Sequence, residues 1–227
     1  MTEMSPLHRD LRLAAFDQLM GIAVTPRPVE GPAQTRATGS LAALQTEIEK
    51  GFPWCESLAG ATQCVFGEGN ESADLVFVGE APGAEEDRAG RPFVGPAGRK
   101  LDEIITAMGF TRETVYICNV LKARPPENRA PLPDEVAMSA PWLAAQLRLI
   151  QPKVIVALGG AAAKFLLETT TGITRLRGQF ASWTDPETGR VIPVMPTFHP
   201  AYLLRNYTPQ TRREMWEDMQ QVIGLLG

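Results

Sequence analysis

Residues 75–98 read LVFVGEAPGAEEDRAGRPFVGPAG, and this stretch is the most informative feature of the sequence. Its apolar start fits a buried strand, because a short apolar run bounded by turn residues is typical of a sheet interior. The glycines and proline of residues 79–83 then end the strand. Consecutive acids, Glu85, Glu86 and Asp87, follow, and then an aromatic, Phe93. A plain turn requires none of these, so the stretch predicts a strand that delivers acids and an aromatic ring to a site.

Strand-like and helix-like segments alternate after Cys64. Strands are predicted at 74–79, 115–120, 153–158 and 191–196, and helices at 96–108, 133–150, 160–168 and 210–225. Strands separated by helices predict an α/β protein with a mostly parallel sheet covered on both faces. Ligands of such sheets bind beyond the carboxyl ends of the strands, which is where the segments after 79, 119 and 197 fall.

The first fifty residues are predicted to form an extension. Residues 5–20 fit a short amphipathic helix with Ser5 as N-cap and Pro6 as its first residue. Proline, glycine and threonine interrupt any period in residues 25–39, which fit a linker. A second helix is predicted from Ser40 to Lys50. We therefore expect an N-terminal helical extension and linker, 1–50, followed by one main domain, 51–227.

The composition is that of a globular protein, with 44% hydrophobic and 21% charged residues in 227. No apolar run approaches the length of a membrane span, and the N-terminus does not resemble a secretory signal. The cysteines number three, a sparse set that favours a reducing cytoplasm over a disulfide framework. The net charge of −4 argues against a generally basic surface but does not exclude a local basic face.

Asn119 lies among apolar residues near a predicted strand end. Its planar amide presents one acceptor and two donors. Uracil offers N3–H beside O4, which one amide can serve, whereas cytosine offers the opposite pair. Taken alone, an asparagine that closes a turn is the commoner interpretation.

His199 precedes Pro200, which biases its backbone towards extended geometry. The following residues 202–205, YLLR, form an apolar wedge that ends in a charge, and such a wedge can fill the space left by an extruded base. The alternative is a helix start with core leucines. Basic residues could also assemble a phosphate-binding face, although each alone is more often a solvated charge: Lys122, Arg124, Arg129, Arg175, Arg177, Arg205, Arg212 and Arg213.

Three segments, taken in this order, resemble the uracil-DNA glycosylase superfamily, most of all its family four. They are residues 79–98, residues 116–135 (YICNVLKARPPENRAPLPDE) and residues 199–206 (HPAYLLRN). The resemblance covers about residues 52–225. It implies a three-layer α/β/α fold around a central, mostly parallel four-stranded sheet. It also implies a DNA glycosylase that flips out and excises uracil from DNA and leaves an abasic site for base excision repair. No lysine of the matched motifs is placed as a Schiff-base nucleophile, so we expect a monofunctional enzyme, and we expect it to be monomeric and cytoplasmic. The main domain would then be catalytic, with uracil-containing DNA as its partner.

The resemblance also implies roles for individual residues. Phe93 would stack on the flipped uracil, and Asn119 would read its Watson–Crick edge. His199 would donate a hydrogen bond to uracil O2 and stabilise the charge that develops there. The backbone at Ala81 would help to hold the base.

Two carboxyl groups, Glu80 and Glu86, would lie beside the attacking water or the C5 edge of the base. Other branches of the superfamily carry an acid at the position of Ala81, so the resemblance leaves open which group activates the water. Asn128 matches the family pattern without a clear role. The predicted DNA contacts are those of the wedge: Pro200, Leu203, Leu204 and Arg205.

The metal site is where the sequence departs from family four, which normally holds a four-iron cluster on four cysteines. Cys55 stands at the first ligand position, and the other positions carry Leu58, Ala123 and Ser139. Because such a cluster needs four thiolates, we expect no iron–sulfur cluster and no other metal or cofactor. Residues 123–142 also lack the His-bearing basic insertion of the branch that bonds covalently to DNA, so covalent capture is not expected.

The sequence is also compatible with two functions other than uracil excision. The first is a glycosylase for another deaminated or mismatched base, and the second is a non-catalytic member of the superfamily that binds damaged DNA. The joint presence of Phe93, Asn119 and His199 favours the enzyme.

Overall fold

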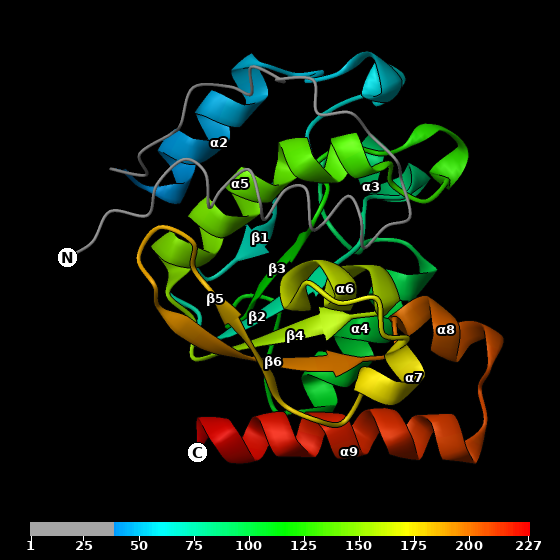
Figure 1. Ribbon diagram of the computed structural model, residues 1–227. Helices are drawn as coiled ribbons and strands as arrows, with labels where there is room; N and C mark the ends of the chain where they lie inside the picture. The colour runs from blue at the N-terminus through cyan, green and yellow to red at the C-terminus, as the bar shows by residue number, and fades with distance from the viewer. Residues whose placement is uncertain (1–38) are drawn as a thin grey trace.

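The computed structural model describes residues 39–227, and it is a three-layer α/β/α structure (Figure 1). The predicted helix at 5–20 and nearly all of the predicted linker lie outside the described residues. The sheet has six strands in the order β1-β3-β2-β4-β6-β5. In the described part of the chain, no helix is both long enough and apolar enough to cross a membrane.

The centre of the sheet consists of parallel strands: β3 (Tyr116–Asn119), β2 (Leu75–Gly79), β4 (Val154–Leu158) and β6 (Val191–Thr197). Every residue of β2, β3 and β4 is buried, which explains why these strands read as continuous apolar runs. The register pairs Gly79 with Asn119 and Leu158 with Thr197, so the carboxyl ends of the strands meet at one edge.

Antiparallel strands flank this centre: β1 (Glu68–Gly69) pairs with β3, and β5 (Ala181–Thr184) pairs with β6. The expected sheet of four strands is therefore corrected to six, although the α/β/α class is confirmed. The physical reason is that β1 has two residues and β5 exposes three of its four, so neither carries an apolar run.

Helices cover both faces of the sheet (Figure 1). One face packs against α5 (Pro133–Ile150) and α6 (Gly160–Leu167), with α2 (Leu41–Lys50) packed on α5, and the other packs against α4 (Pro96–Ala107) and α9 (Pro209–Leu226). Shorter elements connect them: α3 (Ala84–Ala89), α7 (Ile173–Leu176), α8 (Pro200–Arg205) and the 3-10 turns Glu56–Leu58 and Pro126–Asn128.

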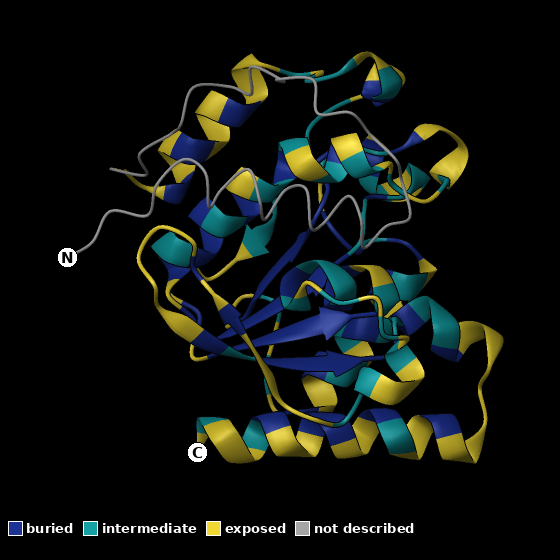
Figure 2. Ribbon diagram, viewed as in Figure 1, coloured by how far each residue is buried: buried dark blue, intermediate teal, exposed yellow. Residues whose placement is uncertain are grey.

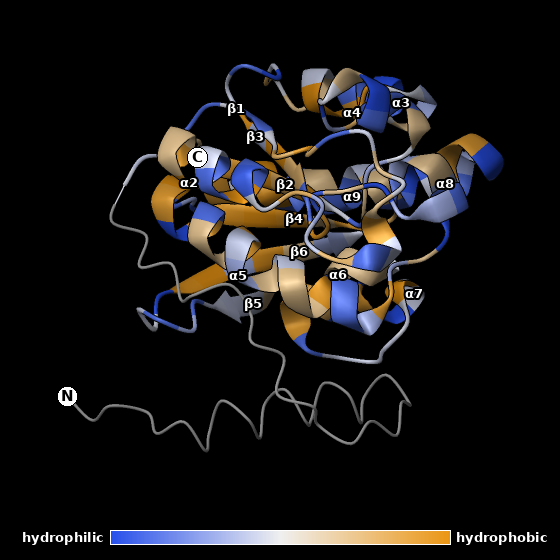
Figure 3. Ribbon diagram, turned by 90° about the horizontal axis from the view of Figure 1, so that it is seen from above, coloured by the Kyte–Doolittle hydropathy of each residue, from blue (hydrophilic) through white to orange (hydrophobic). Residues whose placement is uncertain are grey.

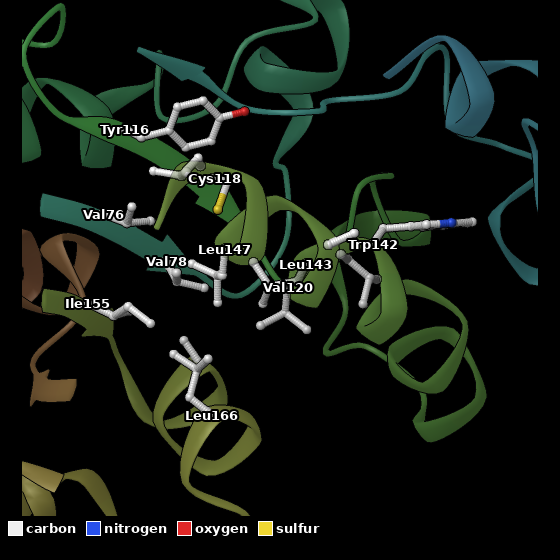
Figure 4. Close-up of a cluster of buried hydrophobic side chains, with 14 of the residues drawn as sticks. Val76, Val78, Tyr116, Cys118, Val120, Trp142, Leu143, Leu147, Ile155 and Leu166 are labelled. Atoms are coloured by element: carbon white, nitrogen blue, oxygen red, sulfur yellow. The ribbon is translucent and has the colours of Figure 1, made fainter. Parts of the chain in front are cut away.

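Each face of the sheet has its own core, because successive residues of a strand point to opposite faces. Val76, Val78 and Ile155 lie in the core under α5 and α6 (Figure 4), whereas Leu75 and Phe77 lie in the core under α4 and α9. Burial is concentrated in the central strands and on the inner helix faces (Figure 2), and these central strands are strongly hydrophobic (Figure 3).

Helix α2 shares the first of these cores through Leu41, Leu44 and Ile48. It begins as expected, since the Ser40 side chain accepts the N–H of Ala43. The domain boundary at residue 50 stays a prediction.

Candidate active site

Gly79, Phe93 and Asn119 pack together where β2 and β3 end. A side-chain carbon on Gly79 would lie 2.3 Å from Asn119 Oδ1 and 2.5 Å from the Phe93 ring, so only glycine fits there. Asn119 is 2% exposed, and no donor within residues 39–227 bonds its Oδ1. A buried acceptor without a donor costs about 1–3 kcal/mol, which a ligand N–H would offset. Asn119 Oδ1 is therefore able to accept a hydrogen bond from a ligand.

The loop that carries Phe93 is fixed from several sides. The φ of Phe93 is 53°, which is uncommon for an aromatic residue and requires support from its surroundings. Arg112 donates to the carbonyl oxygens of Pro92 at 2.7 Å and Phe93 at 3.1 Å. A side-chain carbon on Gly98 would lie 1.8 Å from the Phe93 carbonyl oxygen, so this close approach requires glycine.

Glu86 holds the same loop from α3. Its Oε1 accepts the N–H groups of Val94 and Gly95, both at 2.9 Å, and its Oε2 accepts the N–H of Gly83 at 3.1 Å. These contacts give Glu86 a role in placing Phe93. Its predicted contact with water or the base stays a prediction.

His199 lies between β6 and α8 in the extended conformation expected before proline, with φ −70° and ψ 140°. Its Nδ1 accepts the N–H of Ala201 at 3.1 Å, so the neutral ring carries its proton on Nε2. Burial, reinforced by the charge of Arg205 and opposed by Glu86, lowers the pKa of His199 from 6.5 to about 4. At neutral pH His199 is consequently an uncharged N–H donor.

The His199 ring stacks on Phe93, with ring centroids 5.6 Å apart and planes at 30°. Gly159, whose φ is +92°, permits this position, since a side-chain carbon there would lie 2.9 Å from His199 Cβ. Phe93 in turn adjoins Asn119 across Gly79. The structure thus brings together the three side chains that the sequence singled out.

Glu80 faces a cavity of about 370 Å³ between the β2 and β3 ends and α6, where Lys164 and Phe165 also line it. The walls of this cavity do not include the three converging side chains. Burial raises the pKa of Glu80. Ala81 packs partly against the core beside it. The predicted roles of Glu80 and Ala81 stay predictions.

Helix α8 divides the wedge into buried and exposed residues. Pro200 is buried, and Leu203, 4% exposed, packs with Phe198 in a small core cluster. Leu204 is 45% exposed, and Arg205 is exposed. Helix α8 begins at Pro200 and turns most of Pro200 and Leu203 inward, and their predicted contacts with DNA stay predictions. Leu204 and Arg205 remain at the surface.

The basic residues named in the sequence analysis do not form one face, because several of their side chains bond to other groups within the protein. Lys122 is fully buried, its pKa is lowered by burial, and its Nζ donates to the backbone carbonyl of Asn119 at 2.7 Å. Arg177 pairs with Asp218 at 2.6 Å. The remaining arginines of the set that are exposed are Arg175, Arg205, Arg212 and Arg213.

The residues at the expected cluster positions do not fit an iron–sulfur cluster. Leu58 and Ala123 lie in the apolar core, and the buried Ser139 Oγ has no hydrogen-bond partner in the part of the chain that the structure describes. Cys55 is the one thiol at these positions, and its Sγ lies 3.2 Å from Ser57 Oγ. Within residues 39–227, no three His, Cys, Asp or Glu side chains are grouped so as to hold a metal ion.

An ion-pair network connects the same segments. Fully buried Glu135 accepts from Ser57 Oγ at 2.7 Å, from Arg129 at 2.6 and 2.9 Å, and from the Leu132 N–H at 2.8 Å. Burial opposes the charge of Glu135, but these hydrogen bonds outweigh it and lower its pKa. The network ties the loop around the exposed Asn128 to the 3-10 turn at residues 56–58. The role of Asn128 stays a prediction.

The sequence does not indicate the residues that position the site. Arg112 lies 19 residues beyond Phe93, and no spacing rule links them. The glycines that the site requires gave only a weak signal in the sequence. Each stands at or near the boundary of a strand or helix, where many small or polar residues are equally suitable. They are Gly79, Gly98 and Gly159.

Comparisons with known proteins agree with this arrangement. A family model described as the uracil DNA glycosylase superfamily matches residues 66–220, which include Phe93, Asn119 and His199. The Type-4 uracil-DNA glycosylase of Thermotoga maritima is 47% identical over 168 residues, covering 74% of this chain and 85% of that protein. The Type-4 enzyme of Archaeoglobus fulgidus is 45% identical over 178 residues, covering 76% of this chain and 87% of that protein.

Proposed function

Because this chain belongs to the uracil DNA glycosylase superfamily, we propose that it is a monofunctional uracil-DNA glycosylase. It hydrolyses the N-glycosidic bond of deoxyuridine in DNA, releases uracil and leaves an abasic site for base excision repair. One observation carries the proposal most directly: the buried Oδ1 of Asn119, which has no donor among the described residues, lies beside the Phe93 ring, and the neutral His199 stacks on that ring.

Recognition takes place after the nucleotide leaves the base stack. Uracil N3–H donates to Asn119 Oδ1, and uracil O4 accepts from the same amide. Cytosine would set its N3 acceptor against Oδ1, which leaves both atoms unpaired and costs binding energy. Phe93 supplies the stacking surface, and the backbone at Ala81 closes the other side of the base.

Bond cleavage moves the electron pair of the C1′–N1 bond onto uracil, so that negative charge develops on N1 and O2. His199 Nε2–H donates to O2, and this bond is strongest when the charge is fully developed, which lowers the barrier. Water then adds to C1′ of the sugar cation and gives up a proton. Glu80 and Glu86 are the two carboxyls proposed to lie beside this water or beside the C5 edge of the base.

We further propose that the protein works as a monomer in the cytoplasm and without an iron–sulfur cluster. Support for the last point comes from the leucine, alanine and serine at the expected ligand positions. The Glu135–Arg129 network then provides a tie between residues 55–58 and the 124–132 loop.

A panel of oligonucleotides tests the choice of base. Single-stranded and duplex DNA containing uracil, hypoxanthine, xanthine or mismatched thymine would be incubated with the protein and scored for alkali-labile sites. We expect cleavage at uracil. Preferred cleavage at another base would favour the first rival function, and binding without cleavage of any of them would favour the second.

A further inference from the structure

A groove of about 460 Å³ lies next to α8, apart from Phe93, Asn119 and His199. It runs between α4, the segment after α8 and the first turns of α9, at the end of the molecule toward which β4 and β6 point (Figure 1). Cationic and aromatic side chains line much of it: Lys100, Tyr207, Arg212, Arg213 and Trp216.

The aromatic residues of the groove are open to solvent. Tyr207 is 57% exposed and Trp216 is 37% exposed, although large aromatics are usually buried. The Tyr207 ring holds two cations near it, with Lys100 Nζ 5.0 Å and the Arg212 guanidinium 5.1 Å from the ring centroid. Such contacts fix the direction in which the long cationic side chains point.

The charge of the groove is positive, whereas that of the whole chain is −4. Glu103 is the one acid among the lining residues, and it pairs with Lys100. Within residues 39–227, neither Arg212 nor Arg213 forms an ion pair, and both are exposed. Their charges are therefore available to an anionic partner.

The groove is continuous with the wedge, because Leu203 of α8 lines it and the exposed Leu204 and Arg205 follow directly. Proteins that hold single-stranded DNA combine cations that follow the phosphates with aromatic rings on which bases stack. We propose that this groove binds one strand of the substrate DNA beside the flipped nucleotide, with phosphates at Arg212 and Arg213 and a base stacked on Trp216. The inference rests on the proposed function for the position of the flipped nucleotide.

Salt-dependent binding to a fluorescein-labelled single-stranded oligonucleotide without uracil tests the charge part, independently of excision. Each phosphate contact on a single strand contributes about 0.7 to the slope of log K against log salt. R212Q/R213Q should therefore reduce that slope by about 1.4. The matched control K50Q/R190Q removes two exposed cations elsewhere and should leave the slope unchanged. An unchanged slope for R212Q/R213Q, or an equal reduction in both variants, overturns the proposal.

Two substitutions of Trp216 test the stacking part with the same oligonucleotide. Trp216→Leu should lose about five- to a hundredfold in affinity, because it removes the stacking ring. Trp216→Phe keeps a ring and should recover most of that loss. Equal affinities for the leucine variant and the parent protein overturn the stacking role. Uracil release by the parent protein, measured separately, tells whether the proposed function itself has failed.

Discussion

Replacing His199 by alanine removes a single uncharged N–H donor from the place where uracil O2 becomes negative. The ring has its proton on Nε2, because Nδ1 accepts the N–H of Ala201. Loss of one preorganised donor to a developing oxyanion typically costs about 10²–10³ in rate, or roughly 3–4 kcal/mol. Binding should weaken much less, since O2 is nearly neutral in the bound substrate.

Single-turnover rates and equilibrium binding should be measured for His199→Ala on one uracil-containing oligonucleotide. His199→Gln is the matched control, because glutamine keeps an N–H donor on a side chain of similar reach and should recover part of the rate. Both variants lose the cap of α8, so thermal unfolding should be recorded for each. A rate loss below tenfold, or one that only follows affinity, would make His199 a structural residue of its loop.

The pH dependence of stability gives a second view of the same side chain. The pKa of His199 is about 4 in the folded protein and 6.5 ordinarily, so the unfolded chain binds more protons between these values. The free energy of unfolding that depends on His199 is fully present above pH 6.5 and is lost as the pH falls towards 4. At 1.36 kcal/mol per pH unit, the loss amounts to about 3 kcal/mol at most. Urea unfolding of the parent protein and His199→Ala across this range should show a difference that shrinks as pH falls.

Further substitutions test other parts of the site. Asn119→Asp should lower uracil excision at least about tenfold, because a charged carboxylate repels O4; an unchanged rate would remove Asn119 from base reading. Leu204→Ala and Arg205→Ala should harm excision from duplex DNA more than from single strands, because only a paired base must be unstacked; equal losses would limit α8 to packing or phosphate contact. Glu135→Gln should lower the free energy of unfolding, measured in urea, by about 3 kcal/mol, because it breaks a buried ion pair. A change within experimental error would show that the network does not stabilise the fold. The purified protein should lack iron and sulfide by chemical analysis, and stoichiometric amounts of both would contradict a cluster-free site.

The central strands were predictable because their residues are buried on both faces and thus form apolar runs. β2 and β4 lie within one residue of their predicted starts. β1 and β5 were not predictable. β1 has two residues and β5 has four that are mostly exposed, so neither strand carries a pattern that distinguishes it from a loop.

The convergence of Asn119 and His199 followed from their places at strand ends. What supports them did not, because it depends on contacts between distant residues: Ser57 bonds Glu135 across 78 positions, and Arg112 holds the Phe93 carbonyl across 19. The orientation of α8 was equally hidden, since a short helix with two adjacent leucines does not reveal which one faces the core.

The proposed glycosylase activity is best tested by the release of free uracil. An oligonucleotide with a single deoxyuridine would be incubated with excess purified full chain, and the released base and the abasic site would be quantified together by mass spectrometry. We expect free uracil and abasic sites in equal amounts, without strand cleavage before alkali treatment. Stable binding of the oligonucleotide with no release of uracil would contradict the proposed activity.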